Sequence, residues 1–359
     1  MATNRPTPEF WANKRVFVTG HTGFKGSWLV TWLDLLGSKI YGYALPPETN
    51  PNMFEALGLS DYCEQTLDDI RDRARLDQAM AAFEPEIVFH LAAQPLVRRS
   101  YREPIETLST NIMGTAHVLE ACKRSSSVKA VVIVTSDKCY ENLEQQQAYQ
   151  EDDRLGGHDI YSTSKACAEL VTSGYRDAFF TDGPMVGTAR AGNVIGGGDW
   201  SADRLIPDAV RAIFAREELK IRHPDAIRPW QHVLDPLCGY LLLAEGLFNK
   251  QQPELLGAFN FGPTHESAKT VKEVVTAFFS YWPDGPEWLH FDDPEKFHEA
   301  RLLSLDFSKA HKLLNWSPAL DLSSALELTA KWYKAFEENE NDPVFMREMT
   351  RASIQEYAG

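Results

Sequence analysis

The sequence predicts a protein of the α/β class, with a doubly wound parallel sheet and a smaller α/β lobe built from the last third of the chain. Three observations support this prediction. Short apolar, β-branched runs alternate with helix-like segments through the first half of the 359 residues. A glycine-rich turn follows the first apolar run. The regular alternation fades after Gly192. Apolar strands separated by helices are typical of a parallel sheet covered by helices on both faces.

The elements are predicted in order along the chain. Continuous apolar runs predict strands at residues 15–19, 39–44, 87–91, 130–135 and 185–191. Helical spacing of apolar residues predicts helices near 27–36, 76–82, 111–124 and 161–180. Beyond Gly192, helices are expected at 205–215, 234–247, 270–281, 308–314 and 322–339, with a short strand at 259–261. The sheet domain should therefore span 1–191, with a segment of about 233–262 returning to it, and the smaller lobe should comprise 192–232 and 263–359.

The composition narrows the range of partners and compartments. The formal net charge of −15 repels nucleic acid and anionic lipid, so neither is an expected partner. Residues 1–14 contain no apolar signal region, and no apolar run is long enough to span a membrane. We therefore expect a cytoplasmic protein. No metal site is expected, and the five cysteines should be reduced thiols because none forms a CxxC pair: Cys63, Cys122, Cys139, Cys167 and Cys238.

The glycine-rich turn predicts a dinucleotide site and, with it, a Rossmann-type sheet. Gly20, Gly23 and Gly26 form a GxxGxxG pattern directly after the first strand and directly before the first helix. Glycines at these positions allow a tight turn and close approach of the backbone to a pyrophosphate. The helix N-terminus then supplies amide donors. The alternative is a glycine-rich turn without a ligand.

The residues alone leave NAD and NADP open. The second strand runs into Leu45-Pro46-Pro47, with no acidic residue to bind the adenosine ribose before Glu48. Lys25 and His21 in the loop could face either the pyrophosphate or a 2′-phosphate. The predicted dinucleotide contacts also include Phe24, and Asp69 and Ile70 at the adenine.

Tyr161 and Lys165 form the first candidate catalytic pair. They are four residues apart and therefore share one face of the predicted helix. A nearby ammonium and a nicotinamide cation both favour the phenolate, so the pKa of Tyr161 is expected to fall. A phenolate can remove a hydroxyl proton while hydride leaves the carbon for the nicotinamide.

A second acid–base pair follows the strand at 130–135. Ser136 supplies a hydroxyl, and Asp137 and Lys138 place a carboxylate beside an ammonium. A simple alcohol dehydrogenase needs only the tyrosine and the lysine, so this second pair indicates a further chemical step. The alternative is that Lys138 only forms a salt bridge with Asp137 or Glu141.

Nine motifs carry a resemblance to a known family. They are GHTGFKG (20–26), DIRD (69–72), HLAAQP (90–95), STNIMGT (109–115), VTSDKCY (134–140), YSTSK (161–165), RAGNVIGGGDW (190–200), RPWQHVLD (228–235) and LNWSP (314–318). In this order the chain resembles the extended short-chain dehydrogenase/reductase family, specifically the nucleotide-sugar 4,6-dehydratases, and it is most similar to those acting on CDP-glucose. The resemblance covers nearly the whole chain.

The resemblance implies NAD as cofactor and a three-step reaction. Tyr161 takes the proton of the sugar 4-hydroxyl as the C4 hydride is transferred, water is lost across C5–C6, and the hydride returns to C6. In this reading Asp137 protonates the departing 6-hydroxyl. Most members carry Glu where this chain has Lys138, so the C5 base stays open: Lys138 acts with a lowered pKa, or it stays charged and stabilises the enolate. Leu91, Ala92 and Ala93 in HLAAQP are expected to contact the cofactor.

The resemblance also implies how a nucleotide sugar is held by the smaller lobe. Arg228 and Arg301 are the expected anchors of the diphosphate and ribose, with Arg204 as a further candidate. Asn193 is expected to contact a phosphate or the sugar, and Asn111 to hold a turn near the active site. A homodimer or homotetramer is expected, in a pathway of deoxysugar synthesis for a lipopolysaccharide O-antigen. The alternatives are a dehydratase for another nucleotide-glucose and a 4-epimerase, which would not need Asp137 and Lys138.

Overall fold

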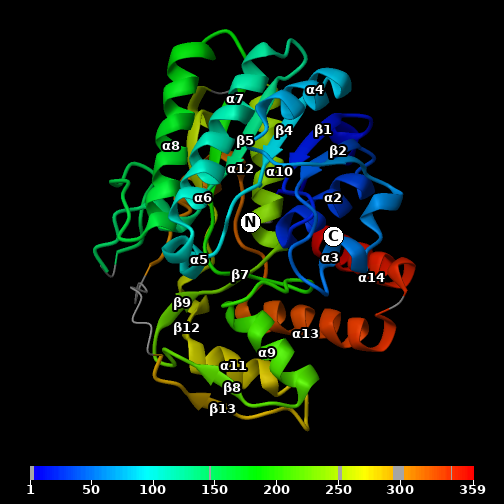
Figure 1. Cartoon of the computed structure of the whole chain (residues 1–359), viewed down its shortest axis with the longest axis vertical. Helices are drawn as coiled ribbons and strands as arrows, with labels where there is room; N and C mark the ends of the chain where they lie inside the picture. Colours follow the sequence, from blue (N-terminus) through cyan, green and yellow to red (C-terminus); the bar gives the residue numbers. More distant parts are fainter. Residues whose placement is uncertain (1–3, 145–146, 250–252, 294–302, 341) are drawn as a thin grey trace.

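A seven-stranded parallel sheet forms the centre of the computed structural model, which describes residues 4–144, 147–249, 253–293, 303–340 and 342–359 (Figure 1). All six strand pairings in this sheet are parallel. In spatial order the strands are β11 (Gly257–Asn260), β6 (Met185–Arg190), β5 (Ala130–Val134), β4 (Ile87–His90), β1 (Arg15–Thr19), β2 (Lys39–Ala44) and β3 (Glu64–Leu67).

The strand order makes this a doubly wound sheet, as predicted. The chain winds outward from β1 through β2 to β3, then crosses to β4 and winds the other way. The reversal lies between β1 and β4, and ligands of such sheets bind at this point, beyond the carboxyl ends of the strands. β3 was not predicted, because its sequence EQTL is polar and it forms a partly exposed edge.

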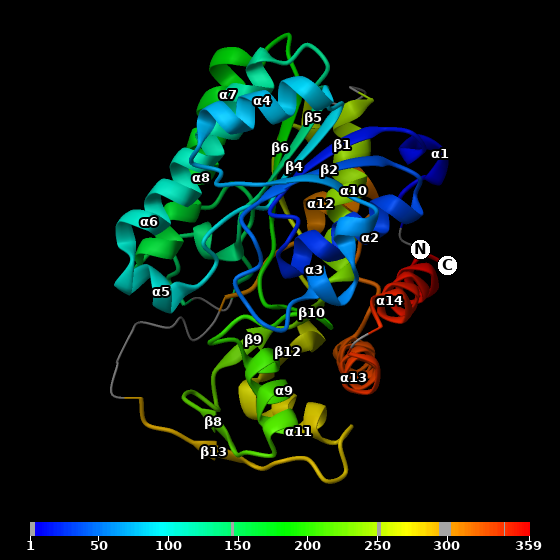
Figure 2. The same ribbon diagram turned by 45° about the vertical axis from the view of Figure 1, so that its right-hand side comes forward.

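Helices cover both faces of the sheet, and alternate strand residues contact them (Figure 2). Phe17, Val88 and Val131 pack on the side of α4 (Arg73–Phe83), α7 (Gly114–Arg124) and α8 (Ile160–Phe179). Val16 and Phe89, on neighbouring positions, pack on the side of α2 (Phe24–Leu35), α10 (Leu234–Phe248) and α12 (Ser308–Leu314). This two-sided burial explains why the strands read as continuous apolar runs.

A smaller group of elements lies below the carboxyl ends of the strands in Figure 1. It pairs β8 (Leu219–Ile221) with β13 (Trp288–His290) and β9 (Ile227–Pro229) with β12 (Ala268–Thr270), and it includes α9 (Leu205–Ala215) and α11 (Val271–Phe279). β7 (Val194–Ile195) pairs with β10 (Gln231–His232) between this group and the sheet.

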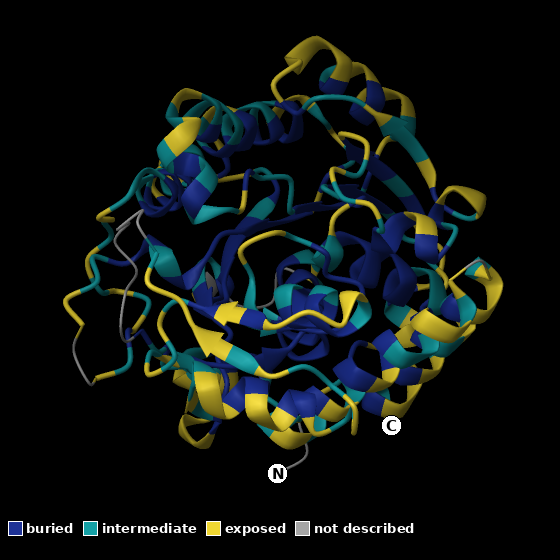
Figure 3. Ribbon diagram, turned by 60° about the horizontal axis from the view of Figure 1, so that its bottom comes forward, coloured by how far each residue is buried: buried dark blue, intermediate teal, exposed yellow. Residues whose placement is uncertain are grey.

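The chain ends in two helices, α13 (Leu322–Asn339) and α14 (Pro343–Ala358), and α14 was not predicted. α14 packs against α2 and against α3 (Met53–Ala56) beside the sheet. In Figure 3 the central strands and the inner helix faces are buried, whereas the outer helix faces are exposed. The division into two domains stays a prediction.

The shorter helices are α1 (Pro8–Trp11), α5 (Val97–Arg102), α6 (Pro104–Leu108), a π-helical turn at Ser109–Met113, and 3-10 turns at Leu59–Asp61, Asp137–Cys139, Pro253–Leu255 and His265–Ser267.

Among the described residues, no helix is long and apolar enough to cross a membrane. No group of three or more His, Cys, Asp or Glu side chains in the same residues is arranged to hold a metal ion.

Candidate active site

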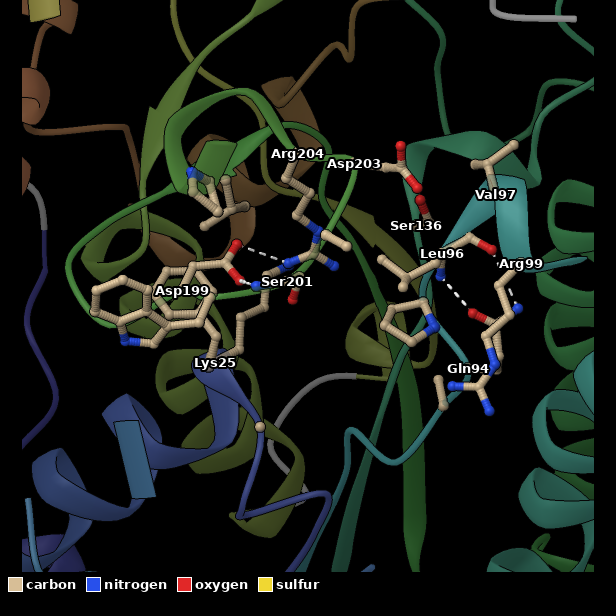
Figure 4. Close-up of a pocket in the computed structure, with 18 of the residues that line it drawn as sticks. Lys25, Gln94, Leu96, Val97, Arg99, Ser136, Asp199, Ser201, Asp203 and Arg204 are labelled. Carbon is tan, nitrogen blue, oxygen red and sulfur yellow. Dashed lines mark hydrogen bonds and ion pairs between the residues drawn. The ribbon is translucent and has the colours of Figure 1, made fainter. Parts of the chain in front are cut away.

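A cleft of about 760 Å³ lies between the carboxyl ends of the strands and the smaller group of elements (Figure 4). Its volume is in the range of sites that bind cofactors and other small molecules. Residues following β1, β2, β4, β5 and β6 form one wall, and residues from α9, β8 and β9 form the other. The cleft therefore lies at the reversal point of the sheet, where the fold predicts a ligand.

The glycine loop has the geometry of a phosphate cradle. Gly20 has a φ of +75°, and a Cβ there would lie 2.6 Å from the backbone nitrogen of Ala92. A Cβ on Gly26 would lie 2.1 Å from the carbonyl oxygen of Gly20. Gly23 is the N-cap of α2 and has no side chain to cap the helix, so the first amides of α2 face the cleft without a side-chain partner. These features fit a bound pyrophosphate, with the positive end of the helix toward it.

His21 and Lys25 leave the loop in different directions. The His21 ring is fully buried against Gly42 and pairs through Nε2 with Oε1 of Gln65 at 2.6 Å. Burial lowers its pKa, and the ring is not among the described residues that line the cleft. Lys25 lines the cleft. Burial lowers the pKa of Lys25 to about 7, and the charges of Arg204 and Lys165 act in the same direction.

The residues expected at the adenosine end also line the cleft. Asp69 accepts hydrogen bonds from the Arg71 side chain, which lowers the pKa of its carboxyl. Ile70 is buried, and a Cβ on Gly114 would lie 2.9 Å from it. Phe24, Leu91, Ala92 and Ala93 line the same cleft.

Tyr161 and Lys165 lie on the first turns of α8 and are 7% and 6% exposed. Asp159 caps the helix by accepting from the amide of Ser162 at 2.8 Å. The Lys165 Nζ donates to the carbonyl of Val134 at 3.4 Å, so the ammonium lies at the end of β5.

The pKa of Tyr161 differs from the expectation. Burial raises it to about 12, a hydrogen bond with Ser136 and the charge of Arg204 lower it, and Asp137 raises it. The expected fall is therefore wrong for the protein groups alone, because desolvation of the phenolate outweighs them.

Ser136, Asp137 and Lys138 lie in the 3-10 turn directly after β5 and line the cleft with Tyr161. Ser136 Oγ donates to Asp137 Oδ1 at 2.9 Å and accepts from the amide of Lys138 at 3.2 Å. A Cβ on Gly192 would lie 2.1 Å from Asp137 Oδ2, so only a glycine lets the carboxylate take this position. The structure thus brings both predicted pairs into one cleft.

Asp199 belongs to this site and was not singled out from the sequence. Its side chain is 4% exposed, and Oδ2 accepts from Nη1 of Arg204 at 2.8 Å (Figure 4). Lys25 lies beside this pair in Figure 4. The sequence signal was a single acid in the loop GGGDW, and only the fold shows that Arg204, five residues later, turns back to it.

The other expected substrate contacts fall in different places. Asn193, with a φ of +22°, and Arg228 line the cleft. Arg301 lies outside the described residues. Asn111 is buried, and its amide bonds the backbone of Gln94 and the hydroxyl of Ser164. It therefore holds the turn after β4, and its role toward a substrate stays a prediction.

Known proteins resemble this chain over most of its length. Residues 17–329 match the GDP-mannose 4,6 dehydratase family. A CDP-glucose 4,6-dehydratase of Salmonella typhimurium is 50% identical over 333 residues, which cover 91% of this chain and 92% of that protein. An epimerase structure from Methanothermobacter thermautotrophicus superposes with a TM-score of 0.79 at 24% identity, covering 96% of both chains. MoeE5 in complex with UDP-glucuronic acid and NAD has a TM-score of 0.75 at 25% identity, covering 89% of this chain and 99% of that one.

The doubly wound sheet, the glycine loop and the Tyr161–Lys165 pair define an extended short-chain dehydrogenase/reductase. Within that class, the match over residues 17–329 shows that the chain belongs to the GDP-mannose 4,6 dehydratase family.

Proposed function

We propose that the protein converts CDP-D-glucose to CDP-4-keto-6-deoxy-D-glucose. The observation that carries the proposal is the meeting of two acid–base pairs, Tyr161 with Lys165 and Asp137 with Lys138, in one cleft. The first pair suits oxidation of a hydroxyl, and the second suits loss of water from the neighbouring carbons. The 50% identity to a CDP-glucose 4,6-dehydratase supports CDP-glucose as the substrate.

NAD fits the loop and the walls of the cleft. Gly20, Gly23 and Gly26 leave room for a pyrophosphate, and the amides at the start of α2 can bind it. Asp69 and Ile70 line the cleft and are proposed to border the adenine, and Leu91, Ala92 and Ala93 are proposed to border the rest of the cofactor. When bound, NAD supplies the acceptor of the C4 hydride and its later donor.

The two pairs act in sequence on the sugar. Tyr161 removes the proton of the 4-hydroxyl, with Ser136 hydrogen-bonded to its phenol oxygen. The ketone formed at C4 makes the C5 hydrogen acidic. Asp137, held by Ser136 and seated on Gly192, then protonates the departing 6-hydroxyl. Lys138 lines the same cleft and takes the proton from C5, a role that requires its neutral amine, and the C5–H electron pair forms the C5–C6 double bond as water leaves.

The arginines of the outer wall suit a diphosphate. Arg204 and Arg228 line the cleft with Asn193 and bring positive charge to a protein with a net charge of −15. Arg301 is proposed as a further anchor. We also propose a cytoplasmic homodimer whose product enters deoxysugar synthesis for a surface polysaccharide of the O-antigen type.

The substrate is tested by incubating the protein and NAD separately with CDP-glucose, dTDP-glucose and UDP-glucose. A 4-keto-6-deoxy product, detected by its absorbance in alkali, is expected with CDP-glucose. A response only to dTDP-glucose or UDP-glucose would overturn the nucleotide assignment. Formation of a 4-epimer without loss of water would overturn the reaction itself.

A further inference from the structure

A buried ion pair, Glu169 with Arg190, lies one helical turn beyond Lys165. Glu169 follows Lys165 by one turn of α8, and Arg190 ends β6. Their side chains are each 4% exposed. The guanidinium Nε and Nη2 donate to the two carboxylate oxygens at 3.0 and 2.9 Å, a bidentate geometry. No step proposed above uses either residue.

Four hydrogen bonds hold the Glu169 carboxylate. Besides Arg190, it accepts from Thr135 Oγ1 at 2.5 Å and from Thr188 Oγ1 at 2.7 Å. Burial disfavours its ionised form, but Arg190 and these hydrogen bonds outweigh burial and hold the pKa below its ordinary value. Glu169 is therefore a fixed negative charge.

The same pair ties together several parts of the chain. Arg190 Nη1 donates to Tyr140 Oη at 2.7 Å and to the carbonyl of Glu151 at 3.0 Å. Tyr140 donates in turn to Asn260 Oδ1 at 2.8 Å, on β11. A buried network with every contact satisfied in this way holds its members in one arrangement.

Two contacts from α8 meet consecutive residues at the end of β5. Lys165 donates to the carbonyl of Val134, and Glu169 accepts from the hydroxyl of Thr135. The next residues along the chain are Ser136 and Asp137. One helix therefore positions Tyr161 with Lys165 and, through the end of β5, Asp137 with Lys138.

We propose that Glu169 and Arg190 are positioning residues. They fix the position of the Lys165 ammonium relative to Thr135, which directly follows β5. Tyr161 and Asp137 can then act on the same sugar. This inference rests on the proposed function. Neither residue touches the substrate in it; both act through Lys165 and Thr135.

The charge of Glu169 also acts on Lys165. Burial lowers the pKa of Lys165 to about 8, and Cys139 and Glu169 act in the opposite direction. Lys25, from the glycine loop, and His90, at the end of β4, also interact with this ammonium. Without the Glu169 charge, Lys165 should lose its proton at a lower pH.

The first test is the pH profile of Glu169→Gln, measured with CDP-glucose and NAD. The alkaline limb of kcat should move about one pH unit lower, with kcat at pH 8 reduced 10-fold or more and KM for CDP-glucose within twofold of wild type. The conservative variant Glu169→Asp keeps the charge and should restore the wild-type position of the limb. A Glu169→Gln enzyme with the wild-type limb and kcat would overturn the proposal.

A second variant decides the matter if Glu169→Gln does not fold, since it leaves a buried guanidinium unpaired. Thr135→Val cuts the link from β5 to Glu169 without changing any charge. It should lower kcat about 10-fold with KM and the pH limb unchanged; a kcat within twofold of wild type contradicts the proposal. The matched control is Thr172→Val on α8, whose buried hydroxyl bonds only its own helix through Ala168 and should leave kcat and the profile unchanged.

Failure of the inference can be told apart from failure of the proposed function. Wild-type protein that does not turn over CDP-glucose contradicts the proposed function, and the variants are then measured with the nucleotide-glucose that it does dehydrate. Wild-type turnover with unchanged Glu169→Gln and Thr135→Val variants contradicts only the positioning role.

Discussion

At the scale of single residues, Asp137 can take its position only because residue 192 is a glycine. Its Oδ2 lies where a Cβ on Gly192 would be, and its Oδ1 accepts from Ser136. The carboxylate is 5% exposed yet lines the cleft. Lys138 follows it in the same turn, so an acid and an amine line the cleft from adjacent residues.

Variants of these two residues should block different steps of the proposed reaction. Lys138→Ala should reduce exchange of the C5 hydrogen with solvent by about 100-fold or more, because the group acting at C5 is lost. Asp137→Asn should keep C5 exchange but reduce product formation by a similar factor, because the 6-hydroxyl is no longer protonated. Both are read by NMR of the sugar in deuterium oxide. Exchange at the wild-type rate in Lys138→Ala would remove Lys138 from the mechanism.

Asp235 provides a prediction about stability. Its buried Oδ1 accepts from the amide of Ala319 and the hydroxyl of Tyr357, whereas Oδ2 has no hydrogen-bond partner. Burial raises its pKa to about 6, above its value in the unfolded chain. The native state therefore binds the proton more tightly, and this contribution to stability, complete below about pH 4, is lost as pH rises through 6.

Asp235→Asn stays neutral at every pH. Relative to wild type, its free energy of unfolding should rise by up to about 3 kcal/mol between pH 4 and pH 7, as measured by urea unfolding at both values. The exposed Asp182→Asn serves as control and should show no such trend. A difference between Asp235→Asn and wild type that does not vary with pH would contradict the burial argument.

At the scale of elements, the turn between β1 and α2 is tightly constrained. Gly20 and Gly26 face each other, and their separation leaves no room for a Cβ. α2 starts without a side-chain cap, which leaves its first amides to a ligand. The loop can therefore bind phosphate only if the helix approaches the strand this closely.

Gly26→Ala should weaken NAD binding. Its Cβ would meet the Gly20 carbonyl at 2.1 Å, so the loop must shift. Overpacking of this kind costs about 1–3 kcal/mol, or roughly 5- to 150-fold in dissociation constant, measurable by calorimetry with NAD.

The control is Gly174→Ala, at an exposed position of α8 where a Cβ meets nothing within 4 Å. It should bind NAD normally and raise the free energy of unfolding by about 0.5–1 kcal/mol. NAD affinity in Gly26→Ala equal to wild type would show that the loop does not form the cofactor site.

Sequence reasoning located most of the elements. The apolar strands β1, β2, β4, β5 and β6 were predicted because both faces of the sheet are covered and leave a continuous apolar signal. β3 is a half-exposed edge without that signal. α14 is amphipathic with scattered apolar positions, and its burial depends on α2, more than 300 residues earlier.

At the scale of the whole molecule, the last helix closes the fold next to its beginning. α14 lies across α2 and α3, and Trp32 stacks edge-on with Tyr357. Arg5 lies over the Tyr357 ring at 4.3 Å and donates to its carbonyl. The two ends of the described chain are therefore fastened to the same side of the sheet.

Met346 tests this closure. Its side chain, on α14, is fully buried, whereas that of Phe345 beside it is 43% exposed. Met346→Ala should lower the free energy of unfolding by about 2–5 kcal/mol in denaturant titration, because it leaves a cavity. Phe345→Ala should lower it by less than about 1 kcal/mol. Equal losses for the two variants would contradict this packing.

The sequence by itself predicted the apolar strands of the sheet, the glycine loop and the residues of both acid–base pairs, because each of these signals lies within a few neighbouring residues. Only the tertiary structure decided that Lys25 lies near Lys165 and Asp199 whereas His21 bonds Gln65. It also decided that Asp199 accepts from Arg204 and that Glu169 pairs with Arg190. The reason is physical: the direction and charge of a buried side chain depend on partners that folding brings from distant parts of the chain.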